Sequence, residues 1–341
     1  MDATKIYIIQ PCQKAIPNLK SLTKFNLFTA TIHFGIACFF MYLVIKTEDS
    51  ITLMANREAL VMIATCWNVS RTDKNETHFD IKNKWVDTAG TRKSTITTCI
   101  IIFHLLSAAF QGVPWLLYWF KFPPFVKYFN NVICNNGTQV LRYTEYTLSA
   151  PLMIVAIGLS FGILDVYTLA GLGALTALCM QLGLAADVFR VSARDTCAIT
   201  SIFMTLGAAS DEVRFQMTCI AQEMKINLKR YMYLFHVASW VAIILPWFVI
   251  IKVFVDLSNQ TYSNECSTPD STTEMPAAII FIVFGEAILF AAFGFVQVCQ
   301  IWYFDDSSLK FGTRVEWVFI SLSLVSKTAL GLAIYSSSIF T

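Results

Sequence analysis

A single lysine, Lys327, lies in the middle of an apolar stretch that carries no other charge from Val318 to the end of the chain. Either end of the run 315–338 is about eleven residues from this lysine, roughly 17 Å along a helix. That distance is too long for the side chain to reach the membrane surface. Because a bare ammonium at the bilayer centre costs roughly 3 kcal/mol or more, an intramembrane lysine indicates a functional site. The chemistry that best uses such a lysine is Schiff-base attachment of an aldehyde chromophore.

The composition places the chain in a lipid bilayer. Of its 341 residues, 56% are hydrophobic and only 14% are charged, whereas soluble domains carry about 25% charged residues. The sequence contains no Gly-rich phosphate loop, HExxH motif or paired CxxC motif. We therefore expect a membrane protein that is not an enzyme and that binds neither nucleic acid nor a metal.

Seven apolar stretches are long enough to cross a hydrocarbon core of about 30 Å. They predict an all-α fold, a seven-transmembrane helix bundle that forms one domain over residues 1–341. A shorter apolar run, 196–208, contains several hydroxyl residues, so we expect it to lie at the membrane surface. The predicted spans are 26–45, 95–119, 140–163, 166–188, 231–255, 277–303 and 315–338.

The charge distribution predicts the orientation in the membrane. With the N-terminus inside, 14 Lys and Arg residues fall on the inner side and nine on the outer side, as the positive-inside rule requires. This places the N-terminus in the cytoplasm and the C-terminus on the extracellular or lumenal side. The long first loop is the exception, because several of its basic residues lie close to span ends. The segment before the first span has no cleavage site, so we expect that span to be a retained anchor.

Three long loops follow from this topology: 46–94 and 256–276 outside, and 190–230 inside. The first loop has room for a short β-hairpin. The inner loop carries a helix signal, because Ser210 can cap a helix whose first turn is acidic and whose last turn is basic. We interpret this helix as interfacial or as an extension of the fifth span, and alternatively as a docking surface for a cytoplasmic partner.

Covalent modification of the outer loops is a further expectation. Cys66 and Cys266 are the only cysteines in the predicted outer loops, so a disulfide between them is plausible in an oxidising compartment. Asn68, Asn75 and Asn259 begin glycosylation sequons on the same side.

The third span carries charges on one helical face. Arg142, Glu145 and Ser149 follow one another at i, i+3 and i+7. Both charges would be costly in lipid, and Lys327 is the only other cation deep in a span. We expect Glu145 to pair with Lys327 and to stabilise a protonated Schiff base there. A structural Arg–Glu pair near the membrane surface is the alternative, and it would suit Arg142.

Other polar residues fall inside the predicted spans. Ser323 lies one turn before Lys327 on the same face and could bond either the imine or the helix backbone. His33 and His104 are satisfied core histidines or the lining of a polar cavity that holds a released proton. Glu286 has no basic partner within its span, so it is either a neutral acid or a proton relay or gate.

Aromatic residues could form the wall of an apolar ligand site. Trp247 follows Pro246 in the fifth span, and Phe290 and Phe293 lie in the sixth. Such a stripe is more often plain core, but the intramembrane lysine favours a flat ligand.

At these residues the chain resembles the heliorhodopsins, retinal proteins with an inverted membrane orientation. Two segments carry most of the resemblance. They are Arg142-Tyr-Thr-Glu145-Tyr-Thr-Leu-Ser149-Ala-Pro-Leu-Met153, continuing through Gly162-Ile-Leu-Asp165, and Leu322-Ser323-Leu-Val-Ser-Lys327-Thr-Ala-Leu. Shorter matches occur at Phe25-Asn26 with His33, Phe103-His104, Pro246-Trp247 and Val296-Gln297.

The resemblance implies a light-sensing photoreceptor with a slow photocycle. It implies all-trans retinal on Lys327, Glu145 as the counterion, an internal polar cavity around His33 and His104, and a homodimer with a cytoplasmic N-terminus. It also implies that Ser149, Ser323 and Trp247 lie near the chromophore. We expect Met153 and Phe290 to complete the chromophore pocket.

The chain departs from the bacterial heliorhodopsin pattern at Pro151, at Glu286 and in its enlarged loops. The loops and sequons suggest a eukaryote or a virus of one as the source. Glu286 stands where an apolar residue is usual, and some viral heliorhodopsins carry protons under light. The alternative function is therefore light-gated or light-driven proton transport along a path that includes His33, His104, Arg142 and Glu286. A retinal-free receptor or transporter is a third hypothesis.

Overall fold

The fold is described by a computed structural model, and the structure describes residues 16–48, 78–130, 132, 137–205, 210–261, 280–303 and 309–339. The elements found among these residues are helical. They are α2 (Ile16–Glu48), α4 (His78–Trp119), α5 (Pro123–Phe129), α6 (Val140–Ser160), α7 (Val166–Thr205), α8 (Asp211–Thr261), the π-helical turn η3 (Phe281–Gly285), α10 (Glu286–Trp302) and α11 (Leu309–Ile339).

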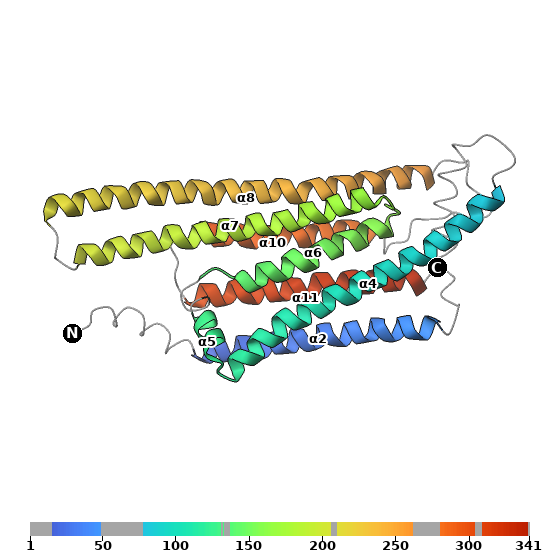
Figure 1. Cartoon of the computed structure of the whole chain (residues 1–341), viewed down its shortest axis with the longest axis horizontal. Helices are drawn as coiled ribbons and strands as arrows, with labels where there is room; N and C mark the ends of the chain where they lie inside the picture. The colour runs from blue at the N-terminus through green and yellow to red at the C-terminus, as the bar shows by residue number, and fades with distance from the viewer. Residues whose placement is uncertain are drawn as a thin grey trace.

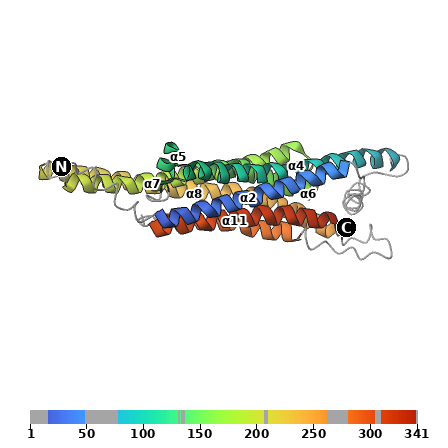
Figure 2. The same cartoon turned by 90° about the horizontal axis from the view of Figure 1, so that it is seen from below.

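The long helices lie side by side in one elongated bundle (Figures 1 and 2). α7 and α8 form an antiparallel pair along one edge, and α2 packs against α4 and α11. α6 packs between α4 and α7, so it has neighbours on both sides. We call the end of the bundle where α7 ends and α8 begins the α7–α8 end. At this end the α7–α8 pair projects well beyond the other helices (Figure 1).

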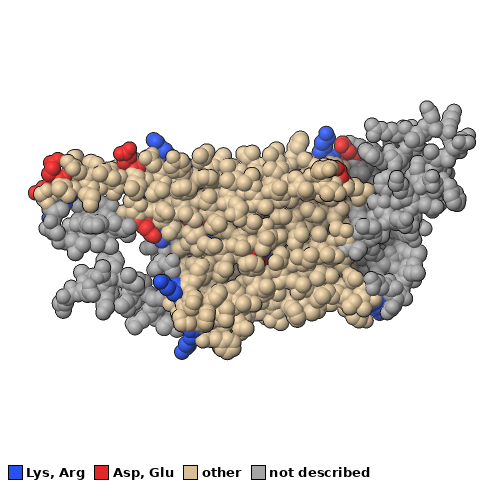
Figure 3. Space-filling view, viewed as in Figure 1, with Lys and Arg blue, Asp and Glu red and all other residues tan. Residues whose placement is uncertain are grey.

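In the described part of the chain, six helices are long and apolar enough to cross a membrane: α2, α4, α7, α8, α10 and α11. In the space-filling view, the middle of the visible face is almost free of charged side chains, which gather toward the two ends (Figure 3). α6 is not among the six, although the sequence analysis predicted a span there. Its buried face includes Arg142, Glu145 and two tyrosines, so its composition is too polar for that criterion.

Helices extend into two of the predicted loops. The segment 190–230 was expected to be a loop, and the run 196–208 a separate surface element. Instead α7 continues to Thr205 and α8 begins at Asp211. The interpretation of the inner helix as an extension of the fifth span is therefore correct. Residues 78–94 of the first long loop are the start of α4, and they form no hairpin.

The sequence explains the ends of the helix that carries the predicted counterion. α6 runs through Pro151 without a break. It stops at a turn in which Gly162 has a φ of 80°, a conformation that suits glycine. Asp165 then accepts hydrogen bonds from the hydroxyl and the backbone N–H of Thr168 and caps α7. These hydrogen bonds lower the pKa of the exposed Asp165 carboxyl.

The two largest apolar clusters among the described residues fill much of the interior. The larger one surrounds Met153, Ile154 and Trp247 and joins buried residues of α2, α4, α6, α7, α8, η3 and α11. The smaller one closes the α7–α8 end of the space between α2, α4 and α11. We call it the α5 cluster, and it consists of Leu19, Leu22, Trp115, Phe129, Val132 and Ile320.

Candidate functional site

Lys327 is buried at the centre of the bundle, with 2% of its surface exposed. Its Nζ donates to Glu145 Oε1 at 2.7 Å, so α11 and α6 are joined by a buried ion pair. The structure thus brings together the two residues that the sequence analysis paired. Nζ also donates to Ser107 Oγ at 2.5 Å, and the Ser107 hydroxyl donates to the carbonyl of Phe103. Ser107 was missed, because a serine within an apolar helix gives no distinctive signal.

His33 and His104 form a second buried contact, between α2 and α4. Their Nδ1 atoms are 2.9 Å apart, so one ring donates a proton to the other. Both side chains are completely buried. His104 lies one turn from Ser107 on α4, so the histidine pair is next to the Lys327 site, as the predicted polar cavity requires.

Arg142 pairs with Glu316, not with Glu145. The Arg142 Nη1 to Glu316 Oε2 distance is 2.9 Å, and both side chains are almost fully buried. The guanidinium also lies over the ring of Phe319, 3.7 Å from its centroid. The alternative of a structural pair between Arg142 and Glu145 is therefore wrong about the partner, because Glu145 pairs with Lys327 and Arg142 with Glu316. Glu316 was missed, although it precedes Lys327 by eleven residues and shares its helical face.

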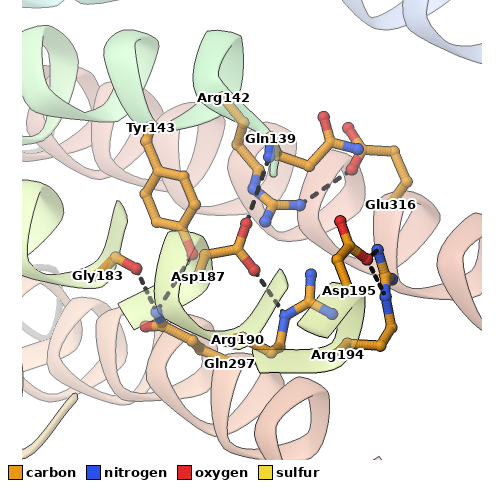
Figure 4. A network of polar contacts seen from close by, with 10 residues as sticks. All are labelled: Gln139, Arg142, Tyr143, Gly183, Asp187, Arg190, Arg194, Asp195, Gln297 and Glu316. Carbon is orange, nitrogen blue, oxygen red and sulfur yellow. Dashed lines mark hydrogen bonds and ion pairs between the residues drawn. The ribbon is translucent and has the colours of Figure 1, made fainter. Parts of the chain in front are cut away.

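A polar network surrounds this pair toward the α7–α8 end (Figure 4). Asp187 Oδ1 accepts from Arg190 Nε at 2.8 Å, and its other oxygen accepts from the backbone N–H of Gln139, where α6 begins. Gln297 donates to the hydroxyl of Tyr143 and to the carbonyl of Gly183. These contacts hold the start of α6 against α7 and α10.

We predict that Glu316→Gln destabilises the protein strongly, because it leaves the Arg142 charge buried without a partner. The expected loss is about 3–5 kcal/mol. The double variant Arg142→Met with Glu316→Leu removes both charges and should cost much less. Thermal unfolding of the purified proteins in detergent measures the loss of stability in the single and in the double variant. Equal losses in the single and double variants would contradict this account.

The predicted pocket residues are buried or half-buried inside the bundle. Trp247 and Phe290 meet with ring centroids 5.6 Å apart, at an angle of 67°. Met153 and Ser149 are buried on α6, and Ser323 is buried one turn before Lys327. Among the described residues, the hydroxyl of Ser149 and the indole N–H of Trp247 have no hydrogen-bond partner. The residues therefore fit an elongated apolar ligand attached to Lys327, with a few unused polar atoms beside it.

Glu286 lies where η3 ends and α10 begins, and it is completely buried. Neither of its carboxyl oxygens has a hydrogen-bond partner among the described residues. π-helical turns inside α-helices often mark functional sites. In the part of the chain that the structure describes, no hydrogen bond or ion pair joins Glu286 to Lys327 or Glu145.

The predicted covalent modifications cannot be placed. Cys66, Cys266, Asn68 and Asn75 lie outside the described residues. Asn259 falls within α8, but its side chain also lies outside the described part. No group of three or more potential metal ligands occurs among the described side chains.

Comparison with known proteins decides the family. The family model for heliorhodopsin matches residues 22–222. The chain belongs to the heliorhodopsin family. A search of the curated proteins found no match.

The heliorhodopsin match covers only part of the site. It includes His33, His104, Arg142, Glu145 and Ser149, and it ends before Lys327. The heliorhodopsins are rhodopsin-type photoreceptors with a retinal chromophore, so the chain is an integral membrane protein of a light-sensing family. The burial of Lys327 against Glu145 extends the site beyond the matched region.

Proposed function

We propose that this heliorhodopsin is a light-sensing photoreceptor that carries all-trans retinal in a Schiff-base linkage to Lys327. The observation that carries the proposal is the buried contact between Lys327 Nζ and Glu145 Oε1. A lysine at this depth is costly in lipid, and the carboxylate offsets part of that cost. Retinal supplies absorption of visible light and isomerisation when it is bound.

Each residue of the site has a defined task. Glu145 stabilises the positive charge on the Lys327 nitrogen as counterion, and Ser107 offers a second acceptor. Ser149, Met153, Trp247, Phe290 and Ser323 line the chromophore pocket. We assign His33 and His104 as candidate acceptors of a proton released from the lysine nitrogen, because an imidazole ring nitrogen can bind a proton and the pair is next to Ser107, which contacts Lys327.

The apolar clusters favour a receptor that keeps this proton inside the protein. Toward the α7–α8 end, the α5 cluster packs apolar side chains between α2, α4, α5 and α11. Toward the other end, Phe40 and Ile100 of the larger cluster pack near the histidines. A slow return of the proton would then give a long-lived signalling state.

The proposed topology has seven spans, with α6 as the third of them. Its charged residues face Lys327 and Glu316 inside the bundle, which makes a polar helix tolerable in a membrane. We further propose a cytoplasmic N-terminus, from the excess of basic residues on that side, and a homodimer. The projecting α7–α8 pair is a surface that a cytoplasmic partner could reach.

An absorption spectrum tests the proposal directly. The protein is expressed and purified with and without added all-trans retinal. We expect a visible band only in the sample with retinal. Absence of a band in both samples would favour a retinal-free receptor or transporter.

Light-gated or light-driven proton transport is the second candidate function. The observation that favours it is Glu286, a buried acid without a hydrogen-bond partner among the described residues. If Glu286 carries protons, Glu286→Gln should abolish the photocurrent measured across a pH gradient, because an amide cannot exchange a proton. Glu223→Gln, at an exposed acid on α8, is the control and should leave the current unchanged. A wild-type protein without photocurrent would exclude transport.

A further inference from the structure

A buried polar seam runs between α2 and α4 beside the chromophore site. Its residues follow one another at three- to four-residue spacing, so they form one face of each helix. All of them are less than 6% exposed. Only the histidines and Ser107 have a task in the mechanism above. The seam consists of Thr23, Asn26, Thr29 and His33 on α2 and His104, Ser107 and Gln111 on α4.

Gln111 is the seam residue that reaches the counterion. Its Nε2 donates to Glu145 Oε1 at 3.5 Å, the same oxygen that accepts from Lys327. On its other side, Gln111 Oε1 accepts from the hydroxyl of Thr29 at 2.9 Å. The Gln111 amide therefore connects α2 to the counterion of α6.

Glu145 and Thr29 together orient the amide. The single proton of the Thr29 hydroxyl can be donated to the carbonyl of Asn26 or to Gln111 Oε1, both at 2.9 Å, and it is needed at Gln111 when the NH₂ group faces Glu145. A flipped amide would place its oxygen against the carboxylate, and two acceptors facing each other repel. With the carbonyl oxygen bonded to Thr29, the NH₂ group is directed at Glu145. The separation of 3.5 Å is at the long limit of a hydrogen bond, so its effect is moderate.

We propose that Gln111, oriented by Thr29, is a positioning residue of the counterion complex that disperses the negative charge of Glu145. This inference rests on the proposed photoreceptor function. A donor on the carboxylate weakens its attraction for the charge on the Lys327 nitrogen. Gln111 would thereby set the colour of the pigment and the pH at which acid neutralises its counterion.

Other charged or titratable groups also face Glu145. They differ from Gln111 because all of them remain in place when Gln111 or Thr29 is changed. A difference in the absorption band or the acid transition between these variants and the wild type is then caused by the Gln111 side-chain amide. The groups that interact with Glu145 are Lys327 and Glu316 on α11 and Tyr146 on α6. Around them, Arg142 on α6 pairs with Glu316, and His33 on α2 and His104 on α4 interact with Lys327.

The test compares Gln111→Leu and Thr29→Val with the wild-type pigment. In Gln111→Leu the carboxylate loses a donor, so the dark band should move to shorter wavelength by about 10 nm, the scale of one moderate hydrogen bond. Acid should then shift the band to the red at a higher pH, by about half a pH unit to one unit. Thr29→Val frees the amide to rotate. It should also move the dark band to shorter wavelength and the acid transition to higher pH, by smaller amounts than Gln111→Leu.

A double variant and a control separate positioning from general damage. Gln111→Leu with Thr29→Val should match Gln111→Leu alone, because Thr29 acts through the amide. Thr23→Val alters a buried threonine that bonds its own helix at Leu19, and it should behave like wild type. An unchanged band and acid transition in both Gln111→Leu and Thr29→Val would overturn the inference. A wild-type protein without any visible band would instead overturn the photoreceptor function on which it rests.

Discussion

Replacing Lys327 by alanine should abolish the visible absorption band of the retinal-treated protein completely. The nitrogen of Lys327 is the proposed attachment point, and it is the buried amine that Glu145 faces. Reduction of the wild-type pigment with borohydride should leave a retinyl group on the peptide that contains Lys327. Absorption spectroscopy and mass spectrometry of the peptides measure the two effects.

Lys252→Ala is the matched control for this loss. Lys252 is an exposed lysine of α8, so its removal should leave the band in place. A normal band in Lys327→Ala would show that retinal binds elsewhere or without a covalent bond. The burial of Lys327 would then have a structural cause only.

Neutralising the counterion should have the second largest effect. Glu145→Gln should move the band to longer wavelength by tens of nanometres, because the carboxylate stabilises positive charge on the nitrogen in the dark state. Absorption of light moves that charge away, so the carboxylate raises the excitation energy. The variant should also lose the red shift that acid causes in the wild type.

Glu316→Gln provides the comparison for the counterion variant. Glu316 is also a buried acid of this region, but it pairs with Arg142 instead of Lys327. It should therefore shift the band far less than Glu145→Gln, although it should cost considerable stability. Equal shifts would mean that the positive charge is shared over both acids, and Glu145 would not be the sole counterion.

The sequence was most informative where charges are rare. Lys327 and Glu145 could be paired because few ionisable residues lie deep in the predicted spans, so each needed a partner. Glu316 was missed because it lies near the start of its span, where a charge could face water. Ser107 and Gln111 were missed because polar uncharged residues occur throughout helices, and only the contacts across helices distinguish these two.

The helices were predicted better than their ends. Apolar length located every long helix, but it could not show that α7 and α8 continue past their apolar segments. Polar residues such as Ser210 and Arg214 suit both a surface loop and a water-exposed helix. α6 shows the opposite limit, because the sequence analysis counted it as a span although its polar buried face keeps it out of the six helices that meet the hydropathy criterion.

Because the α7–α8 pair projects beyond the other helices, a small tilt near Asp187 produces a larger displacement at its tip. Asp187, which contacts the start of α6, lies about 27 Å along the α7 axis from Thr205. A tilt of about 5° at Asp187 would displace Thr205 by about 2 Å. Rearrangements near the counterion that are too small to resolve in place would be magnified at the tip. Distance probes on the tip would therefore report the dark and illuminated states most sensitively.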